Sequence, residues 1–194
     1  MNIYVVLFPD FTALDFVGPV EALSRLDGVK VHYVSLNGGA VANAGGLSIM
    51  TEPFPDGETD VVLIPGGWGT RPLAKDAAFA ERLKALVNGA TWCLTVCTGS
   101  VLLACTGLID GQKATSNKRS FDWVTSTAPS VDWQGEARWV VSGKYYTSSG
   151  VSAGIDMALG FIADQFGRDK ALSAARGMEY VWNDDAATDP FAVK

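Results

Sequence analysis

Three strand-length apolar runs, each followed by a turn and a helical pattern, constrain the fold of this chain more than any other feature. They occupy residues 3–8 (IYVVLF), 60–64 (DVVLI) and 92–96 (WCLTV). Continuous apolar runs are typical of strands in a parallel sheet that helices cover on both faces. Parallel strands need crossover connections, and the helical patterns between the runs supply them. The sequence therefore predicts an α/β protein.

The remaining patterns extend the same alternation along the whole chain. We expect strands at 31–36 and 113–116, a hairpin at 137–148, and a β-hairpin or loose excursion at 37–52. We expect one helix that is entered near 16–19 and others at 76–87, 101–105, 119–127, 151–166 and 169–181. No linker or repeat divides the chain. It is predicted to form one domain over 1–194, a three-layer α/β sandwich around a mostly parallel sheet.

Composition excludes several classes of protein. The 194 residues are 48% hydrophobic, carry a net charge of −6 and show no basic stripe, so neither disorder nor nucleic-acid binding is expected. Three cysteines without a CxxC pair favour a reducing compartment, and no secretory leader precedes the first strand. The longest apolar runs are too short to cross a membrane. We expect a cytoplasmic protein with no membrane or nucleic-acid partner.

Cys97 carries the strongest functional signal. It follows the strand at 92–96 directly and precedes Thr98 and the helical run VLLAC. This order places it in a tight turn between a strand and a helix, which we call the elbow. Open α/β sheets bind ligands at that edge, and a helix N-terminus there favours a thiolate with a lowered pKa. Cys97 is the candidate nucleophile, whereas Cys93 and Cys105 are expected in the core.

Asp15 lies shortly after the first strand, between Leu14 and Phe16. A carboxyl group in such an apolar setting can be partly desolvated and can hold or deliver a proton near neutral pH. Asp is equally typical of a helix N-cap, so the residues leave both roles open. Glu21 is a weaker candidate for the acid/base role, because it lies further along the predicted helix.

The turn PGGWG, residues 65–69, follows the strand at 60–64 and should reach the same edge of the sheet. Its glycines allow the backbone to approach a ligand closely. We expect the amides of Gly67 and Thr98 to stabilise a developing negative charge, with Trp68 beside them as a contact for a small-molecule substrate.

The chain has a single histidine, His32, in the middle of the strand at 31–36, where a structural role is expected. A Cys–His hydrolase needs an imidazole within hydrogen-bond reach of its sulfur. The natural place for one, after the strand at 113–116, holds Asn117 instead. Thiol chemistry must therefore proceed without a histidine base, and Asp15 is the nearby titratable group. No metal-ligand spacing or phosphate loop occurs, so no metal or cofactor is expected.

Four segments together resemble the ThiJ/PfpI superfamily, which has the flavodoxin-like fold of class I glutamine amidotransferases: LDFVGPVE, DVVLIPGGWG, TVCTGSVLLACTGLIDGQKATS and SSGVSAGIDMALGFI. The chain is most similar to the isocyanide hydratase branch, which has Asp in the LDxxGP segment and Thr after the nucleophile. The resemblance implies that Cys97 is the nucleophile, that Asp15 is its acid/base partner and that Thr98 shapes the site. It places Gly67 in an oxyanion-type turn, and Asn117 where relatives commonly have histidine. It also implies a homodimer.

The reaction implied by the resemblance is hydration of an isocyanide, R–N≡C, to an N-substituted formamide through a thioimidate on Cys97. Two other functions stay open: a thiol enzyme of the same fold that acts on glyoxal-type carbonyls, and a redox-sensing or ligand-binding domain. Glyoxalase-like relatives usually present a Glu near the sulfur and a His close by, and this chain matches neither feature cleanly. A regulator would normally carry a DNA-binding module, for which 194 residues leave no room.

Overall fold

The computed structural model describes residues 1–193, which form a single-domain α/β fold. The central sheet has the strand order β3-β4-β2-β1-β5-β6-β10-β9, and its outer pairs β3–β4 and β10–β9 are antiparallel while the other pairs are parallel. Its strands are β1 (Asn2–Val6), β2 (Lys30–Ser35), β3 (Asn37–Ala42), β4 (Ser48–Pro53), β5 (Thr59–Ile64), β6 (Ala90–Val96), β9 (Trp139–Ser142) and β10 (Tyr145–Ser148). The predicted mostly parallel sheet is confirmed.

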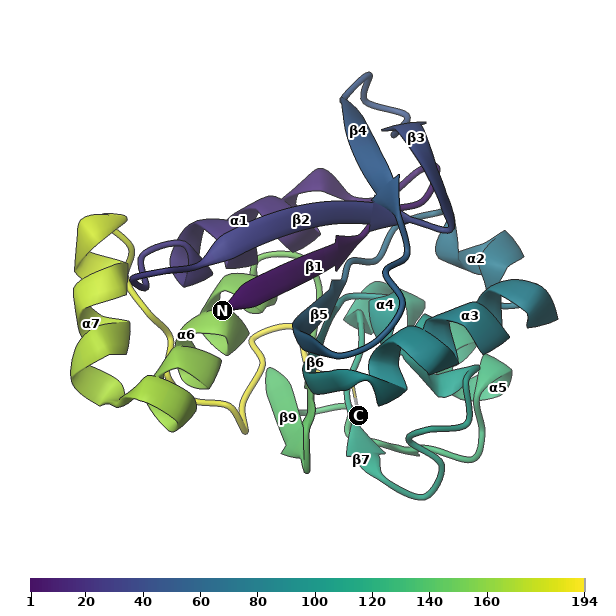
Figure 1. The fold of residues 1–194 in the computed structure, drawn as a ribbon. Helices are drawn as coiled ribbons and strands as arrows, with labels where there is room; N and C mark the ends of the chain where they lie inside the picture. Colours follow the sequence, from purple (N-terminus) through teal and green to yellow (C-terminus); the bar gives the residue numbers. More distant parts are fainter. Residues whose placement is uncertain (194) are drawn as a thin grey trace.

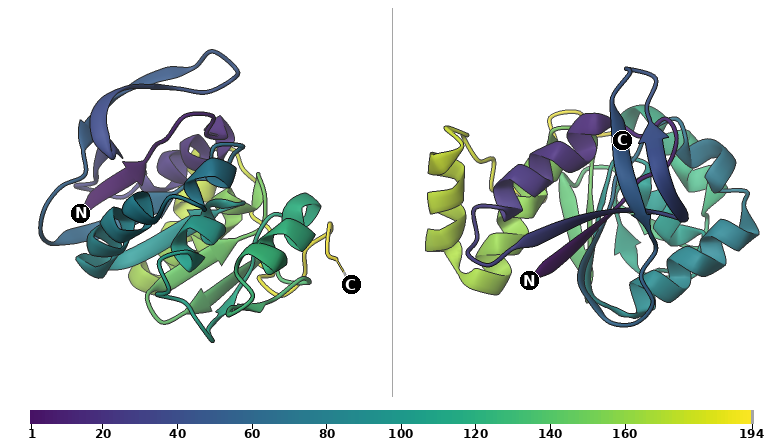
Figure 2. Two further views of the ribbon diagram at one scale, coloured as in Figure 1. Left: turned by 90° about the vertical axis from the view of Figure 1, so that its right-hand side faces the viewer. Right: turned by 45° about the horizontal axis from the view of Figure 1, so that its top comes forward.

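Helices cover both faces of the sheet (Figures 1 and 2). One face carries α1 (Ala13–Leu23), α6 (Ala153–Phe166) and α7 (Arg168–Gly177), and the other carries α3 (Ala77–Asn88) and α4 (Gly99–Ala104). The short helices are α2 (Thr70–Leu73), the 3₁₀ turn η1 (Lys118–Ser120) and α5 (Phe121–Thr127). Among residues 1–193 no helix has both the length and the apolar character that a membrane crossing requires.

The strands β1, β5 and β6 lie side by side in the middle of the sheet. Ile3, Val61 and Leu94 have no exposed surface, which explains why each of these strands is apolar on both faces. Because the three strands are parallel, their carboxyl ends meet at one edge. The segments that follow them contain Asp15, the turn at 65–69 and Cys97.

Helix α1 begins at Ala13, so the predicted entry near residues 16–19 is wrong. Pro19 lies inside the helix, where it removes one backbone hydrogen bond. Packing against α6 explains why the helix continues through it. A Cβ on Gly18 would overlap the side chain of Ile155, so glycine lets the two helices approach closely. This contact between distant segments overrides the local helix-breaking signal.

One segment decides between two predicted forms, and two other segments differ from their predicted bounds. The Gly-rich stretch forms the antiparallel hairpin β3–β4, which projects beyond the sheet at the top of Figure 1. The strand expected at 113–116 shortens to β7 (Lys113–Ala114) and pairs with β8 (Asp132–Trp133), outside the central sheet. The last helix ends at Gly177 instead of continuing to residue 181.

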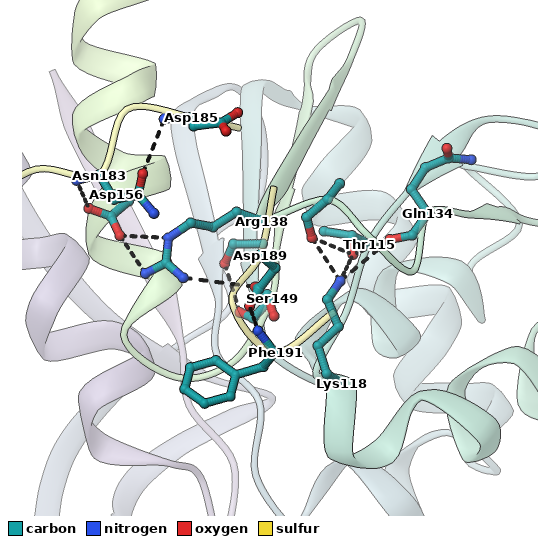
Figure 3. Close-up of polar contacts among 12 residues, drawn as sticks. Thr115, Lys118, Gln134, Arg138, Ser149, Asp156, Asn183, Asp185, Asp189 and Phe191 are labelled. Carbon is teal, nitrogen blue, oxygen red and sulfur yellow. Dashed lines mark hydrogen bonds and ion pairs between the residues drawn. The ribbon is translucent and has the colours of Figure 1, made fainter. Parts of the chain in front are cut away.

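After α7 the chain returns across the molecule as an extended segment, residues 178–193, fixed by buried charges (Figure 3). Asp156 of α6 accepts a hydrogen bond from Arg138 Nε at 2.8 Å, and from the Tyr180 hydroxyl and the Asn183 amide at 3.0 Å. Asp189 is also buried, 3.8 Å from Arg138 Nη1. The segment contains no helix or strand, and these ion pairs and hydrogen bonds attach it to the domain.

Candidate active site

Cys97 lies between β6 and α4, at the elbow that the sequence predicts. Its backbone φ is +58°, an uncommon conformation for a residue other than glycine that costs about 1–3 kcal/mol. Its amide donates to the carbonyl oxygens of Ser148 and Ser149, both at 3.2 Å, at the end of β10. The backbone bonds to the neighbouring strand end therefore hold the elbow in this strained shape.

Asp15 is completely buried in the first turn of α1. Its Oδ2 accepts a hydrogen bond from the Gly66 amide at 2.9 Å, and its carboxyl group neighbours the Cys97 thiol. Burial raises the pKa of this carboxyl group to about 7, against the smaller opposing effects of the Gly66 and Cys97 contacts. The N-cap of the helix is Thr12, so Asp15 does not have the capping role.

The expectation of a low-pKa thiol at Cys97 is wrong. Burial raises the pKa of Cys97 above its ordinary value, and the neighbouring Asp15 charge raises it further. Hydrogen bonds from Thr98 and Asn117 to the sulfur oppose this shift but do not reverse it. Helix α4 has only 6 residues, which limits the dipole on which the expectation relied. The Cys97–Asp15 pair therefore holds its proton at neutral pH as a thiol beside a carboxyl group that titrates near 7.

The turn at 65–69 reaches the elbow, but the amides of Gly66 and Gly67 are already occupied. The Gly66 amide donates to Asp15, and the Gly67 amide donates to Thr98 Oγ1 at 3.1 Å. The Thr70 hydroxyl also lies 3.1 Å from Thr98 Oγ1. The expected use of the Gly67 amide as an oxyanion donor is therefore not available in this arrangement. Thr98 instead connects the elbow to the turn.

Asn117 also lies near the Cys97 sulfur, a contact that the sequence analysis did not predict. Its Oδ1 accepts a hydrogen bond from the Ser120 amide at 3.1 Å, and its amide group is hydrogen-bonded to the sulfur. A Cβ on Gly150 would overlap Asn117 Nδ2 and lie 3.3 Å from the sulfur, so this position requires glycine. The only signal in the sequence was that Asn117 stands where relatives have histidine.

A buried lysine next to Asn117 fixes the segment that carries it (Figure 3). Lys118 Nζ donates to Thr115 Oγ1 at 2.6 Å and to the carbonyl oxygen of Ala137 at 2.7 Å. These bonds fix the Lys118 side chain against the segments that carry Thr115 and Ala137. They hold the chain around Asn117 in place, and Lys118 does not line the cavity described next.

The sulfur opens into a cavity of about 430 Å³. Its described lining consists of Thr12, Gly67, Trp68, Arg71, Cys97, Thr98, Asn117, Arg119, Ser120 and Val151. Trp68, predicted as a substrate contact, is 72% exposed at the rim. The cavity therefore brings together four of the predicted site residues, Cys97, Gly67, Thr98 and Trp68, with Asp15 buried beside the sulfur.

The other candidate residues lie elsewhere. Glu21 is exposed and forms a surface ion pair with Arg25, so it does not reach the sulfur. His32 stacks on Tyr4 with ring centroids 4.8 Å apart, in the middle of β2. Cys93 is fully buried as expected, whereas Cys105 is only partly buried. No cluster of histidine, cysteine and carboxylate side chains among residues 1–193 has the composition of a metal site.

Comparison with known proteins places this arrangement in a family. The DJ-1/PfpI family model matches residues 1–164. The chain is 33% identical to isonitrile hydratase of Pseudomonas putida, over 93% of this chain and 78% of that protein. It is 29% identical to the HTH-type transcriptional regulator CdhR of Pseudomonas aeruginosa, over 90% of this chain and 53% of the regulator.

Solved structures agree with these sequence matches. A crystal structure of a ThiJ/PfpI family protein from Pseudomonas syringae superposes with a TM-score of 0.83 and 31% identity, over 92% of this chain and 74% of that one. Both the sequence match and the structural match extend over most of the chain. The chain therefore belongs to the DJ-1/PfpI family.

Proposed function

We propose that this protein is a hydratase that converts isocyanides to N-substituted formamides, with Cys97 as nucleophile and Asp15 as its acid/base partner. The observation that carries the proposal is the buried Asp15 carboxyl group beside the Cys97 thiol, with a pKa raised to about 7 by burial. A carboxyl group with this pKa can both take and return a proton at neutral pH. The similarity to isonitrile hydratase supports this choice of reaction.

In the first step the Asp15 carboxylate takes the proton of the Cys97 thiol while the sulfur attacks the terminal carbon of R–N≡C. The S–H bond breaks and an S–C bond forms. The Asp15 carboxylic acid then returns the proton to that carbon, which gives the thioimidate R–N=CH–S–Cys97. No histidine is needed, because one carboxyl group acts as both base and acid.

In the second step the Asp15 carboxylate takes a proton from water, whose oxygen adds to the thioimidate carbon, and the resulting Asp15 carboxylic acid gives that proton to the nitrogen. Asp15 then takes the hydroxyl proton of the adduct as the C=O bond forms and the S–C bond breaks, and it passes this proton to the departing sulfur, which releases R–NH–CHO and restores the thiol. Hydrogen bonds from Thr98 and Asn117 stabilise the departing sulfur, because they favour its charged form. Gly67 and Trp68 act through the shape of the cavity. The scheme uses only side chains of this chain and needs no metal or organic cofactor.

The test is turnover of cyclohexyl isocyanide, followed by appearance of the formamide, in the wild type and in Cys97→Ala. Cys105→Ala is the matched control, because Cys105 is partly buried outside the cavity. We expect turnover in the wild type and the control and none in Cys97→Ala. Methylglyoxal consumption without isocyanide turnover would favour the glyoxalase-type alternative. Oxidation of Cys97 without turnover of either compound would favour the sensor alternative.

We further propose that the protein works as a cytoplasmic homodimer on a small-molecule substrate, as the family resemblance implies. Sedimentation velocity tests the assembly, because the measured mass of a dimer is twice the mass of one chain. A monomer across the micromolar range would contradict this part of the proposal without affecting the chemistry.

A further inference from the structure

We propose that the Cys97 cavity recognises small molecules with an anionic group, such as a carboxylate, through Arg71 and Arg119. As a statement about substrate choice, this inference rests on the proposed function. It then predicts that the preferred substrate is an isocyanide with an acidic substituent. Anion recognition itself does not depend on the hydratase reaction, and the two can be tested separately.

Arg71 is held in a defined position at the cavity wall. Its guanidinium carbon lies 4.1 Å from the centroid of the Trp68 ring and 4.6 Å from that of Trp123. Its Nη2 lies 3.5 Å from Ser120 Oγ. Stacking on aromatic rings uses the faces of a guanidinium group and leaves its N–H edges free to donate. The two indoles therefore orient the group without neutralising it.

The charge at this cavity differs from the charge of the chain. The protein has a net charge of −6, yet the described lining of the cavity contains two arginines and no carboxylate. Neither Arg71 nor Arg119 forms an ion pair within residues 1–193, whereas the ion pairs found there use Arg25, His32, Arg138 and Arg168. An oriented guanidinium group without a carboxylate partner, inside a cavity, is the arrangement that binds carboxylates in a bidentate manner.

One small substrate can contact both the arginines and the Cys97 sulfur. Arg71, Arg119 and Cys97 line the same cavity of about 430 Å³, so an anion held by the arginines would keep its reactive carbon in the space next to the sulfur. Asn117, which also lines the cavity, is neutral, so the positive charge of the lining comes from the two arginines. The Asp15 carboxyl group is completely buried and is no part of the lining, so it does not face an anion bound in the cavity.

The first experiment measures anion recognition without any isocyanide. Iodoacetate and iodoacetamide alkylate Cys97 with the same leaving group and differ in charge. Their rate ratio at Cys97 is measured at pH 8 by tandem mass spectrometry in a Cys105→Ser background, and divided by the ratio for glutathione. We expect a normalised ratio of at least tenfold in favour of iodoacetate. Arg71→Gln and Arg119→Gln should each lower it by about tenfold.

Arg82→Gln is the matched control, because Arg82 is an exposed arginine of α3 outside the cavity. It should leave the ratio unchanged. Arg71→Lys keeps the charge but loses the planar stacking, and should give an intermediate ratio. A wild-type ratio equal to that of glutathione would overturn the proposal. Equal slowing of both reagents in Arg71→Gln would overturn it too, because it would mean that Arg71 only packs against the indoles.

The second experiment joins the inference to the proposed reaction. The wild type is expected to hydrate isocyanoacetate with a kcat/KM at least tenfold above that for its neutral ethyl ester, and Arg71→Gln should remove the preference. A retained iodoacetate preference without turnover of either isocyanide would defeat the proposed function and leave the anion site intact. Equal turnover of both, with a normalised alkylation ratio of one, would defeat the anion site and leave the hydratase.

Discussion

Asp156 and Asp15 are both fully buried, but their surroundings differ. Asp156 receives the guanidinium group of Arg138, together with hydrogen bonds from Tyr180 and Asn183 (Figure 3). Asp15 accepts one hydrogen bond from a backbone amide and lies beside the Cys97 thiol, and no cation within residues 1–193 pairs with it. Burial of a carboxylate costs several kcal/mol unless a partner offsets it. The cation makes Asp156 an anchor for the fold, and its absence leaves Asp15 with a pKa near 7, suited to proton transfer.

The largest effect expected from this comparison is the loss of activity in Asp15→Asn. An amide can still accept the Gly66 hydrogen bond, but it cannot exchange a proton near pH 7. We expect kcat/KM for cyclohexyl isocyanide to fall by about 10²- to 10⁴-fold with an unchanged circular dichroism spectrum. Glu21→Gln, on the exposed face of the same helix, is the control and should retain wild-type activity. Full activity in Asp15→Asn would remove the carboxyl group from the mechanism.

The next largest effect is on stability, in Asp156→Asn. This substitution removes the closer of the two carboxylates that pair with the buried Arg138 cation and leaves only Asp189, 3.8 Å away, so we expect the free energy of unfolding in urea to fall by about 3–5 kcal/mol. Arg168→Gln breaks an exposed ion pair with Asp184 and should leave the free energy of unfolding nearly unchanged, because solvent screens exposed charges. If Asp156→Asn lowered the free energy of unfolding no more than Arg168→Gln does, Asp156 would not be an anchor for the fold. The proposed difference between Asp156 and Asp15 would then be wrong.

The pH dependence of stability should carry the signature of Asp15. Because burial raises its pKa from 3.8 to about 7, the native carboxyl group keeps a proton that the unfolded chain has already released. The contribution of this proton to the free energy of unfolding is fully present below about pH 4 and is lost as the pH rises through about 7. The resulting decrease in the free energy of unfolding is about 4 kcal/mol. Urea unfolding of the wild type and Asp15→Asn at pH 4.5 and pH 7.5 measures it. Between pH 4.5 and pH 7.5 the wild type should lose more of its free energy of unfolding than Asp15→Asn does. An equal change in both proteins would contradict the raised pKa.

The smallest effect concerns the neutral contact to the sulfur. Asn117→Ala removes one hydrogen bond from Cys97, which corresponds to about a tenfold loss of kcat/KM. Asn88→Ala, an exposed asparagine at the end of α3, is the control. Gly150→Ala should reproduce the loss, because the added Cβ displaces the same amide group. Wild-type activity in both Asn117→Ala and Gly150→Ala would mean that the contact does not assist the sulfur.

Much of the fold follows from the sequence because its signals are local or periodic. The runs at β1, β5 and β6 are apolar on both faces, and only a covered parallel sheet buries them fully. The order strand, Cys97, helix likewise predicts the elbow, since a parallel strand must turn where the helix begins. The continuation of α1 through Pro19 could not be predicted, because it depends on Gly18 packing against Ile155 of a distant helix.

The sequence by itself therefore determined the parallel sheet, the elbow, and the nearness of Asp15 and residues 65–69 to Cys97. The tertiary structure decided which polar groups near the sulfur remain free. The Gly67 amide is taken by Thr98, Asn117 reaches the sulfur past Gly150, and Arg71 stacks on two indoles. It also reversed the expected pKa shift of Cys97. Hydrogen-bond pairing and desolvation depend on neighbours that are distant along the chain, so no local pattern contains them.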